Sequence, residues 1–549
     1  NYNVVVGDEA GTAITTGDFN VFVGYASGDG TTTSSNNTAV GYDSLTANTT
    51  GANNVAVGAL SLDANTTGDQ NVALGTSALG ALTAGDKNVA VGNSALAAFN
   101  VTDGSETFNT AVGYAAGGAV TTGVNNSIVG GLAGDAITTG DYNVALGMTA
   151  LSTNTASNAN VAIGGQALAD FNVTTDTDTF NVAVGYAAGA AVTTGIHNTL
   201  IGGLAGDALT DADKNVAIGY NALTADTLGS RSVAVGVGSL GTQNFTTATS
   251  AYNVGVGHNA GSVITTGIHN TLIGGQAGDA LTDADDNVAV GLNALTTDTL
   301  GSKSTAIGRA ALASQNFTTA GDSGNTAVGY FAGVSVTTGV QNTLIGSLAG
   351  DALTDAEANV AIGYVALSTD TLGNYSTAIG HQALANQNFT TATNAYNVAV
   401  GHNAGVVVTT GVQNVLIGSL AGDALTTGGA NVAVGYEAFS GEDANSYNVA
   451  VGYQALKVQN AATNGYNTAV GALAGDTVST GRENTLIGYA AGAYNNDITS
   501  GTSNTIVGAY GRTSSAIVSN EIAIGRFVLG QGASTATVGN SGNGATISI

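Results

Sequence analysis

A five-residue pattern, Asn-x-x-aliphatic-Gly, recurs along the whole chain and constrains its fold more than any other feature. The pattern ends on 31 glycines, and most of them stand seventeen positions apart, as Gly58 and Gly75 do. Five longer steps, of twenty-one positions, begin at Gly92, Gly164, Gly236, Gly308 and Gly380. One long step and three ordinary steps form a super-repeat of seventy-two positions, and the spacing becomes less regular after Gly452. Such a chain is expected to fold as stacked repeating units.

The residues before each glycine predict a short β-strand. Val55-Ala56-Val57, for example, alternates with period two, is rich in β-branched residues and is bounded by turn formers. Glycines at the anchor and ten residues later allow the chain to turn twice per coil. We therefore predict an all-β fold, a parallel β-solenoid (β-roll) of about 30 coils of 17 residues. The thirty steps between anchors would give a rod about 145 Å long, with residues 1–508 as its repetitive part and residues 509–549 as irregular C-terminal coils or a cap.

An asparagine stands four residues before most of the anchor glycines. Parallel stacking would place these side chains in a ladder, with amides that hydrogen-bond from coil to coil. The ladder and its glycines include Asn54, Asn71, Asn88, Asn215, Gly58, Gly75, Gly92 and Gly219. A small residue follows most anchors by three positions, as at Ser44, Ala78, Ala95, Ala116 and Ala133. These small side chains either fill a narrow coil interior or mark a surface that another chain approaches closely.

Composition excludes several classes of protein. The chain has 9 basic and 37 acidic residues and a formal net charge of −28, so it has no basic surface for nucleic acid. It has no cysteine and hence no disulfide or thiolate site. No apolar run approaches the ~20 residues of a membrane helix, and we expect no membrane insertion. Because the repeat is already under way at Asn3 and no initiator Met is present, we expect a mature piece or a fragment.

The five long coils, which correspond to the steps of twenty-one positions, carry candidate attachment loops. Each contains an Asn-x-Thr triplet, which begins at Asn100, Asn172, Asn244, Asn316 and Asn388. Four coils correspond to about 19 Å along the stack, so the loops would form an evenly spaced row that contacts a receptor or carries glycan. The alternative is a turn in which Asn and Thr bond to their own backbone.

A second row of candidate residues is acidic. Its members are Asp207, Asp211, Asp213, Asp279, Asp283, Asp285, Asp351, Asp355 and Glu357. Carboxylates two residues apart could share calcium, although no calcium-loop pattern is present, and solvated loop acids are the alternative. We expect no other cofactor. We also expect no enzyme, because no nucleophile and base can be paired and no phosphate loop is present.

Histidine and tyrosine share one position of the repeat. His258, His381 and His402 directly follow anchor glycines, as Tyr42 and Tyr114 do. A planar side chain at the same place in stacked coils predicts ring stacking rather than a ligand or base role.

Two segments carry a resemblance to known fibres. Ser232-Val233-Ala234-Val235-Gly236 resembles the head repeats of trimeric autotransporter adhesins, and Asn448-Val449-Ala450-Val451-Gly452-Tyr453-Gln454-Ala455-Leu456 looks like the related repeats of phage tail fibres. The resemblance runs from Asn3 to about Gly539. It implies a left-handed β-roll and a homotrimer in which the small residue of each coil lies close to a neighbouring chain. Adhesin heads have shorter coils, however, and this sequence has no heptad stalk or membrane-barrel strands.

These features predict an extracellular structural fibre of the cell surface or the virion. It would span distance and present its repeated loops to a host-surface receptor or glycan, and many weak sites would act together. One alternative is a self-polymerising filament subunit, which joins through the unpaired edges of its terminal coils. A third possibility is an ice- or glycan-binding solenoid, since threonine pairs such as Thr49-Thr50 and Thr66-Thr67 would stack.

Overall fold

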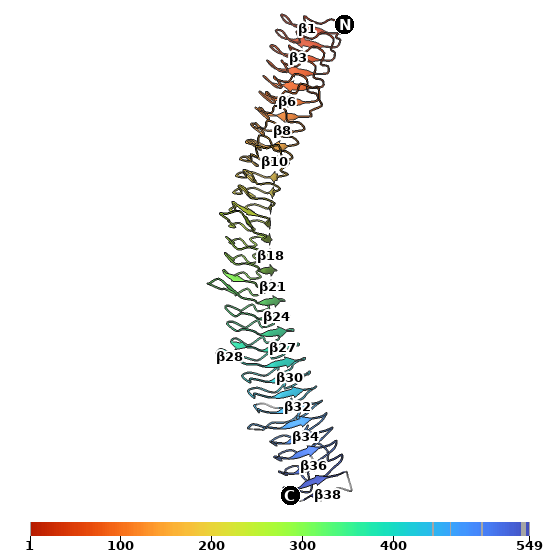
Figure 1. The fold of residues 1–549 in the computed structure, drawn as a ribbon, viewed down its shortest axis with the longest axis vertical. Helices are drawn as coiled ribbons and strands as arrows, with labels where there is room; N and C mark the ends of the chain where they lie inside the picture. The colour runs from red at the N-terminus through yellow and green to blue at the C-terminus, as the bar shows by residue number, and fades with distance from the viewer. Residues whose placement is uncertain (1, 442–443, 462, 496–497, 540–544, 548–549) are drawn as a thin grey trace. The chain divides into compact units, whose positions relative to one another are not determined.

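The computed structural model describes residues 2–441, 444–461, 463–495, 498–539 and 545–547. Within them the chain forms about 31 coils, each with one three-residue β-strand (Figure 1). These described residues include no helix, and therefore none that could cross a membrane. The coils belong to two compact units, Asn1–Asn270 and Thr271–Ile549. The prediction of an all-β parallel solenoid is confirmed.

The first unit is built on one parallel sheet. Its strands are β1 (Val4–Val6), β2 (Val21–Val23), β3 (Thr38–Val40), β4 (Val55–Val57), β5 (Val72–Leu74), β6 (Val89–Val91), β7 (Thr110–Val112), β8 (Ser127–Val129), β9 (Val144–Leu146), β10 (Val161–Ile163), β11 (Val182–Val184), β12 (Thr199–Ile201), β13 (Val216–Ile218), β15 (Val233–Val235) and β17 (Val254–Val256). A short parallel pair, β14 (Gly229–Ser230) and β16 (Thr249–Ser250), lies apart from this sheet.

The second unit repeats this construction. Its strands are β18 (Thr271–Ile273), β19 (Val288–Val290), β21 (Thr305–Ile307), β23 (Thr326–Val328), β24 (Thr343–Ile345), β25 (Val360–Ile362), β27 (Thr377–Ile379), β29 (Val398–Val400), β30 (Val415–Ile417), β31 (Val432–Val434), β32 (Val449–Val451), β33 (Thr468–Val470), β34 (Thr485–Ile487), β35 (Thr505–Val507), β36 (Ile522–Ile524), β37 (Ala536–Val538) and β38 (Ala545–Ile547). Two short pairs accompany the sheet, β20 (Gly301–Ser302) with β22 (Gly321–Asp322), and β26 (Gly373–Asn374) with β28 (Thr393–Asn394).

Neighbouring strands pair in strict register, with equivalent residues over one another. Val55 pairs with Val72 and Ala56 with Ala73, for example. The middle residue of a strand points into the coil and is buried, whereas its two neighbours face outward and are partly exposed. A three-residue strand therefore gives each coil one core side chain and two outward ones.

The small residue three positions after each anchor lies in the coil interior. Ser44, Ala78, Ala95, Ala116 and Ala133 all have no exposed surface within the single chain. The leucine that follows several of them, such as Leu45, Leu79 and Leu96, is equally buried. The first interpretation of the small residues is thus confirmed. Because the chain's own coil encloses these side chains completely, they form no part of the surface of the single chain.

Each anchor glycine meets the next one in the stack. Gly58 has a φ of 136°, and a Cβ added to it would lie 2.5 Å from the carbonyl carbon of Gly75. Any side chain there would strain its own backbone and collide with that of the next coil. This close approach explains why glycine ends every repeat.

The asparagines form the ladder that the sequence predicts, but their side chains bond mainly to backbone groups and less often to one another. The backbone N–H of Asn71 donates to Oδ1 of Asn54 (2.9 Å), and Nδ2 of Asn54 donates to the carbonyl oxygen of Gly68 (2.8 Å). Asn215 bonds in the same way, to Ser232 and Gly229. Direct bonds between side-chain amides occur at fewer places, for example from Nδ2 of Asn88 to Oδ1 of Asn71 (3.0 Å). The ladder therefore satisfies buried main-chain groups and joins each coil to the next.

The stack continues past residue 508. Strands β36 and β37 pair in parallel, and β38 then pairs with β37 in the antiparallel direction. The last described strand therefore runs against the direction of the strands before it in the second unit.

Candidate functional site

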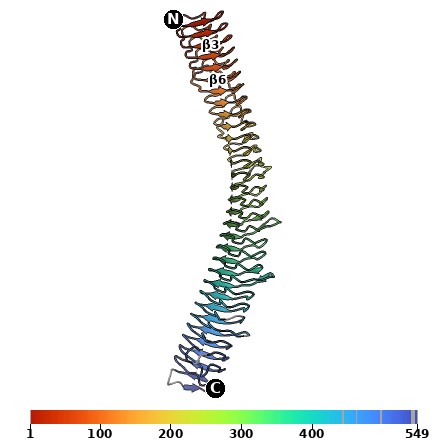
Figure 2. The same ribbon diagram turned by 180° about the vertical axis from the view of Figure 1, so that it is seen from behind.

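The five long coils place polar loops on the surface of each unit, and the later ones extend beyond the neighbouring coils (Figure 2). The exposed stretches include 102–106, 174–178 and 246–248 in the first unit. At the base of each loop, a short parallel contact ties the chain to the preceding coil. This contact is a single bridge in the first two, Asp86 with Glu106 and Asn158 with Asp178, and a two-residue strand pair in the other three. The base of each loop thus lies outside the main parallel sheet.

The predicted loop asparagines lie at these bases. Their Oδ1 atoms accept hydrogen bonds from threonines of the preceding coil. The bonds are Thr83 to Asn100 (2.7 Å), Thr155 to Asn172 (2.9 Å), Thr227 to Asn244 (3.1 Å), Thr299 to Asn316 (3.2 Å) and Thr371 to Asn388 (3.3 Å). The backbone N–H of Asn100 also donates to Thr121 of the following coil (2.8 Å). These side chains therefore link the long coil to a neighbouring coil.

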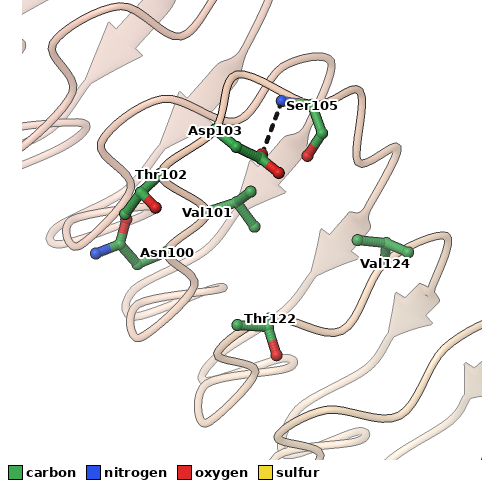
Figure 3. A pocket seen from close by; sticks show the side chains of 7 residues that line it. All are labelled: Asn100, Val101, Thr102, Asp103, Ser105, Thr122 and Val124. Carbon is green, nitrogen blue, oxygen red and sulfur yellow. Dashed lines mark hydrogen bonds between the residues drawn. The ribbon is translucent and has the colours of Figure 1, made fainter.

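A shallow polar hollow lies beside the first loop (Figure 3). Its lining residues are Asn100, Val101, Thr102, Asp103, Ser105, Thr122 and Val124. The backbone N–H of Ser105 donates to Asp103 (3.1 Å), and hydrogen bonds from Ser105 lower the pKa of that carboxyl group. A second hollow lies beside the third loop, with Asp213, Ser230, Arg231, Ala248, Thr249 and Ser250 around it. The first hollow presents hydroxyl, amide and carboxylate groups, and the second presents hydroxyl, carboxylate and guanidinium groups. Groups of these kinds suit hydrogen bonding to a polyhydroxylated ligand.

The acidic row is not gathered into one cluster. Asp207 accepts from Thr224 and Asp211 from Thr194 (both 2.5 Å), while Asp213 accepts from the backbone N–H of Ile196 (2.8 Å). In the later repeats Asp279 accepts from Thr296 and Asp355 from Thr338. Asp283, Asp285, Asp351 and Glu357 occupy the equivalent positions. No group of three or more acidic or histidine side chains suited to a metal ion occurs in the part of the chain that the structure describes.

Aromatic rings stack along each unit, as the sequence predicts. His381 stacks on Tyr364 (ring centroids 5.4 Å apart) and on His402 (5.2 Å). A second aromatic column, which sequence reasoning missed, lies five residues before the anchor glycine, where Phe180 stacks on His197 (6.0 Å). The same column places the ammonium group of Lys87 5.3 Å from the ring centre of Phe108. The signal was present in the sequence, since both columns recur at fixed positions of the repeat.

Sequence reasoning also missed a buried polar network at three of the long coils. Asp226, Gln243, Ser232 and Asn253 are all fully buried. Gln243 Nε2 donates to Asp226 Oδ2 (2.5 Å) and to Ser232 Oγ (3.0 Å), while its Oε1 accepts from Asn253 (2.9 Å). Equivalent bonds recur in the next two super-repeats, at Asp298 with Gln315 and at Asp370 with Gln387.

The network also holds the base of a loop. Asp226 Oδ1 accepts the backbone N–H groups of Gly229 (3.0 Å) and Phe245 (3.1 Å). No cation is among these partners, and burial raises the pKa of Asp226. The carboxylate thus fixes the first residues of the 244–250 loop through hydrogen bonds alone.

Two observations bear on the alternative functions. The outer edge of β37 is occupied by antiparallel β38, so a parallel strand of another chain has no free edge there. The stacked threonine hydroxyls are already engaged, since Thr49 donates to the carbonyl oxygen of Thr66 (2.9 Å) and Thr121 to that of Thr138 (3.1 Å). Each long coil replaces the threonine of this column with asparagine, as at Asn100, which interrupts a continuous array.

No protein-family model and no curated protein matches this chain. The resemblance to adhesin heads and tail fibres therefore depends on the repeat motifs alone.

Proposed function

We propose that this chain is a structural fibre of the adhesin or tail-fibre type. It acts outside the cell, on a cell surface or a virion, where it spans distance and presents its loops for attachment. The observation that carries the proposal is the exposed loop that recurs in each super-repeat within each unit, on coils with hydrogen-bonded bases. The solenoid supplies length and fixed spacing, and the loops supply contact.

The chemistry of the loops favours attachment to glycans on a host surface. The hollows beside two of them offer several hydrogen-bonding groups and little enclosed apolar surface, so a single site would bind weakly. Loops repeated along the fibre, and on several copies of the chain, would bind together with high effective concentration. The resemblance to trimeric fibres supports a fibre made of three copies of the chain.

Trimming the loops tests this proposal. Deletion of residues 102–105, 174–177, 246–249, 318–321 and 390–393 shortens each long coil to the length of an ordinary one and leaves Asn100 and its equivalents in place. Beads coated with the full chain should bind to spots of a printed glycan array or to immobilised lipopolysaccharide. The signal from beads coated with the trimmed chain should be at least about tenfold lower, as expected when multivalent contacts are removed.

A chain with only residues 102–105 deleted is the matched control and should keep most of the binding. Equal binding by the full and trimmed chains would contradict the attachment role of the loops. Failure of the full chain to bind either surface would contradict the choice of glycan.

A further inference from the structure

The aromatic column that directly follows the anchor glycines has gaps of a single coil. Where neighbouring coils both carry a ring, the rings stack, as Tyr436 and Tyr453 do with 5.8 Å between their centroids. At four places one coil instead carries glycine, serine or alanine, while both neighbouring coils carry a ring. We call these places the ring slots. They lie at Gly203 between Tyr186 and Tyr220, at Ser347 between Tyr330 and Tyr364, at Ser419 between His402 and Tyr436, and at Ala472 between Tyr453 and Tyr489.

The two rings that flank Gly203 are exposed and oriented alike. Tyr186 is 63% exposed and Tyr220 is 56% exposed. A Cβ added to Gly203 would lie 3.6 Å from Cδ2 of Tyr220. The equivalent contact of Tyr186, with a Cβ added to Gly165, would be 3.8 Å. Each ring therefore leans toward the coil before it to the same extent, and the two rings stand two coil steps apart, about 9.6 Å.

A gap of this width accepts one flat ring. An aromatic ring midway between Tyr186 and Tyr220 would lie about 4.8 Å from each of them, within the roughly 4.5–7 Å at which aromatic rings stack. His381 shows the same arrangement with the middle position filled, since its ring lies 5.4 Å from Tyr364 and 5.2 Å from His402. Each ring slot is therefore this arrangement without its middle ring.

The surroundings of the slots are apolar. Along the coil of Gly203, the strand β12 ends on Ile201, which is 37% exposed, and Leu204 follows the glycine and is partly exposed. Aliphatic residues hold the same two positions beside Ser347, as Ile345 and Leu348, and beside Ser419, as Ile417 and Leu420. Two ring faces and two aliphatic side chains thus surround the space, so a ligand would be held by stacking and not by an ion pair.

The column already accepts a flat cation from its own chain. Arg309 occupies the column position in the coil before Tyr330, and its guanidinium group lies 5.8 Å from the ring centre of Tyr330. The guanidinium group is planar and stacks on aromatic faces. The face of a tyrosine ring attracts cations, and the net charge of −28 draws cations toward the chain and repels anions.

We propose that each ring slot binds one small, flat aromatic cation, stacked between its two flanking rings. Stacking on both faces supplies the affinity, and the small residue of the middle coil supplies the space. The slots lie on the column after the anchor glycines and not on the long loops, so this binding is independent of the attachment of loops to glycans.

A matched pair of ligands tests the inference on the full chain. N-methylquinolinium is a flat aromatic cation, whereas N,N-dimethyldecahydroquinolinium has the same charge and a similar size but is saturated and not flat. In equilibrium dialysis the chain should bind about four molecules of N-methylquinolinium, one per slot. Its affinity for the flat cation should be at least about tenfold higher than for the saturated one, because only a flat ring stacks on both neighbours.

Filling the slots should abolish this preference. The filled variant carries Gly203→Tyr, Ser347→Tyr, Ser419→Tyr and Ala472→Tyr. Tyrosine holds the same repeat position in neighbouring coils, and the Cβ added at Gly203 makes an ordinary contact, so the variant should keep the circular dichroism spectrum of the parent. Its affinity for N-methylquinolinium should fall at least about tenfold, to that for the saturated cation.

The matched control adds rings to the same column where no ring slot lies. Ala59→Tyr, Thr76→Tyr and Asn93→Tyr together fill the stretch between Tyr42 and Tyr114, and this variant should bind N-methylquinolinium as the parent does. A parent chain that binds both cations equally, or neither, would overturn the inference. So would a folded filled variant that binds the flat cation as tightly as the parent.

Removal of one ring per slot decides the matter if the filled variant does not fold. Tyr220→Leu, Tyr364→Leu, Tyr436→Leu and Tyr489→Leu leave one flanking ring at each slot. Leucine already holds this repeat position at Leu292, so the coil accepts it. Affinity for N-methylquinolinium should fall at least about fivefold, and an unchanged affinity would overturn the inference. Trimming of the long loops leaves the slots intact, so failure of glycan binding is distinguishable from failure of the slots.

Discussion

Oδ2 of Asp226 accepts a 2.5 Å hydrogen bond from Nε2 of Gln243, and both side chains are fully buried. The two residues belong to successive coils, so the bond joins an ordinary coil to the long coil that follows it. Since Oδ1 of the same aspartate accepts two backbone N–H groups, all three neighbours are donors. The site therefore matches an ionised carboxylate, which only accepts hydrogen bonds.

The variant Asp226→Asn should destabilise the first unit. Its Nδ2 group would face a donor, either Gln243 Nε2 or a backbone N–H, and rotation of the Gln243 amide would only move the mismatch to Asn253. A buried unsatisfied group costs about 1–3 kcal/mol. Thermal or denaturant unfolding followed by circular dichroism would measure the loss.

The chain supplies its own control for this site. The first super-repeat has Leu82, Asn88, Phe99 and Val101 where the third has Asp226, Ser232, Gln243 and Phe245, and both Leu82 and Phe99 are fully buried. The fourfold exchange Asp226→Leu, Ser232→Asn, Gln243→Phe and Phe245→Val should recover most of the stability lost in Asp226→Asn. A fourfold variant less stable than the single variant would contradict this account of the site.

Replacement of an anchor glycine should disrupt the stack locally. In Gly147→Ala the new Cβ would lie 2.5 Å from the carbonyl carbon of Gly164, at a φ of 137°. Positive φ and backbone overlap together should cost at least about 2 kcal/mol. Hydrogen exchange should show increased opening of β9 and β10. The matched control Gly131→Ala adds a Cβ with no atom within 4 Å and should leave exchange unchanged; equal effects of the two variants would contradict the close-approach explanation.

Loss of a ladder asparagine should also weaken the stack. In Asn54→Ala the buried N–H of Asn71 loses its side-chain hydrogen-bond partner, whereas the carbonyl oxygen of Gly68 keeps the bond from Nδ2 of Asn65. An unsatisfied buried group costs about 1–3 kcal/mol, and denaturant unfolding would measure the effect. Asn93→Ala, at an exposed position, should stay within about 0.5 kcal/mol of the parent chain. An equally small effect at Asn54 would show that the ladder contributes little.

The coil could be predicted from the sequence because its information is local and repeated. The alternation of Val55-Ala56-Val57 and the spacing of Gly58 and Gly75 specify strand, turn and register within a single coil. The buried network could not be predicted in this way, since it joins residues of successive coils whose side chains differ between super-repeats. In the sequence taken by itself, Asp226 has the character of an acidic loop residue. Only the structure, in which Gln243 of the next coil stacks over it, shows that Asp226 is buried.

Acidification from neutral pH should stabilise the fold. Partial burial raises the pKa of the carboxyl groups of Asp63, Asp135, Asp351 and Asp423, so the folded chain holds these protons more tightly than the unfolded chain does. Their favourable contribution is complete below the ordinary aspartate pKa of about 4 and is lost as pH rises through the folded-state values. The pKa of Glu437 is lowered to about 2, chiefly by hydrogen bonding to Lys457, so the stability that this carboxylate contributes is lost only at lower pH.

The melting temperature should therefore rise between pH 7 and pH 4, and high salt in all samples would suppress the general repulsion of a chain with net charge −28. The variant Asp135→Asn removes one of the four carboxyl groups and should reduce the slope. Its Oδ1 has no hydrogen-bond partner in the structure, so the amide disturbs no existing bond at that atom. A melting temperature that falls on acidification over this range would show that burial of these carboxylates does not control the stability of the coils.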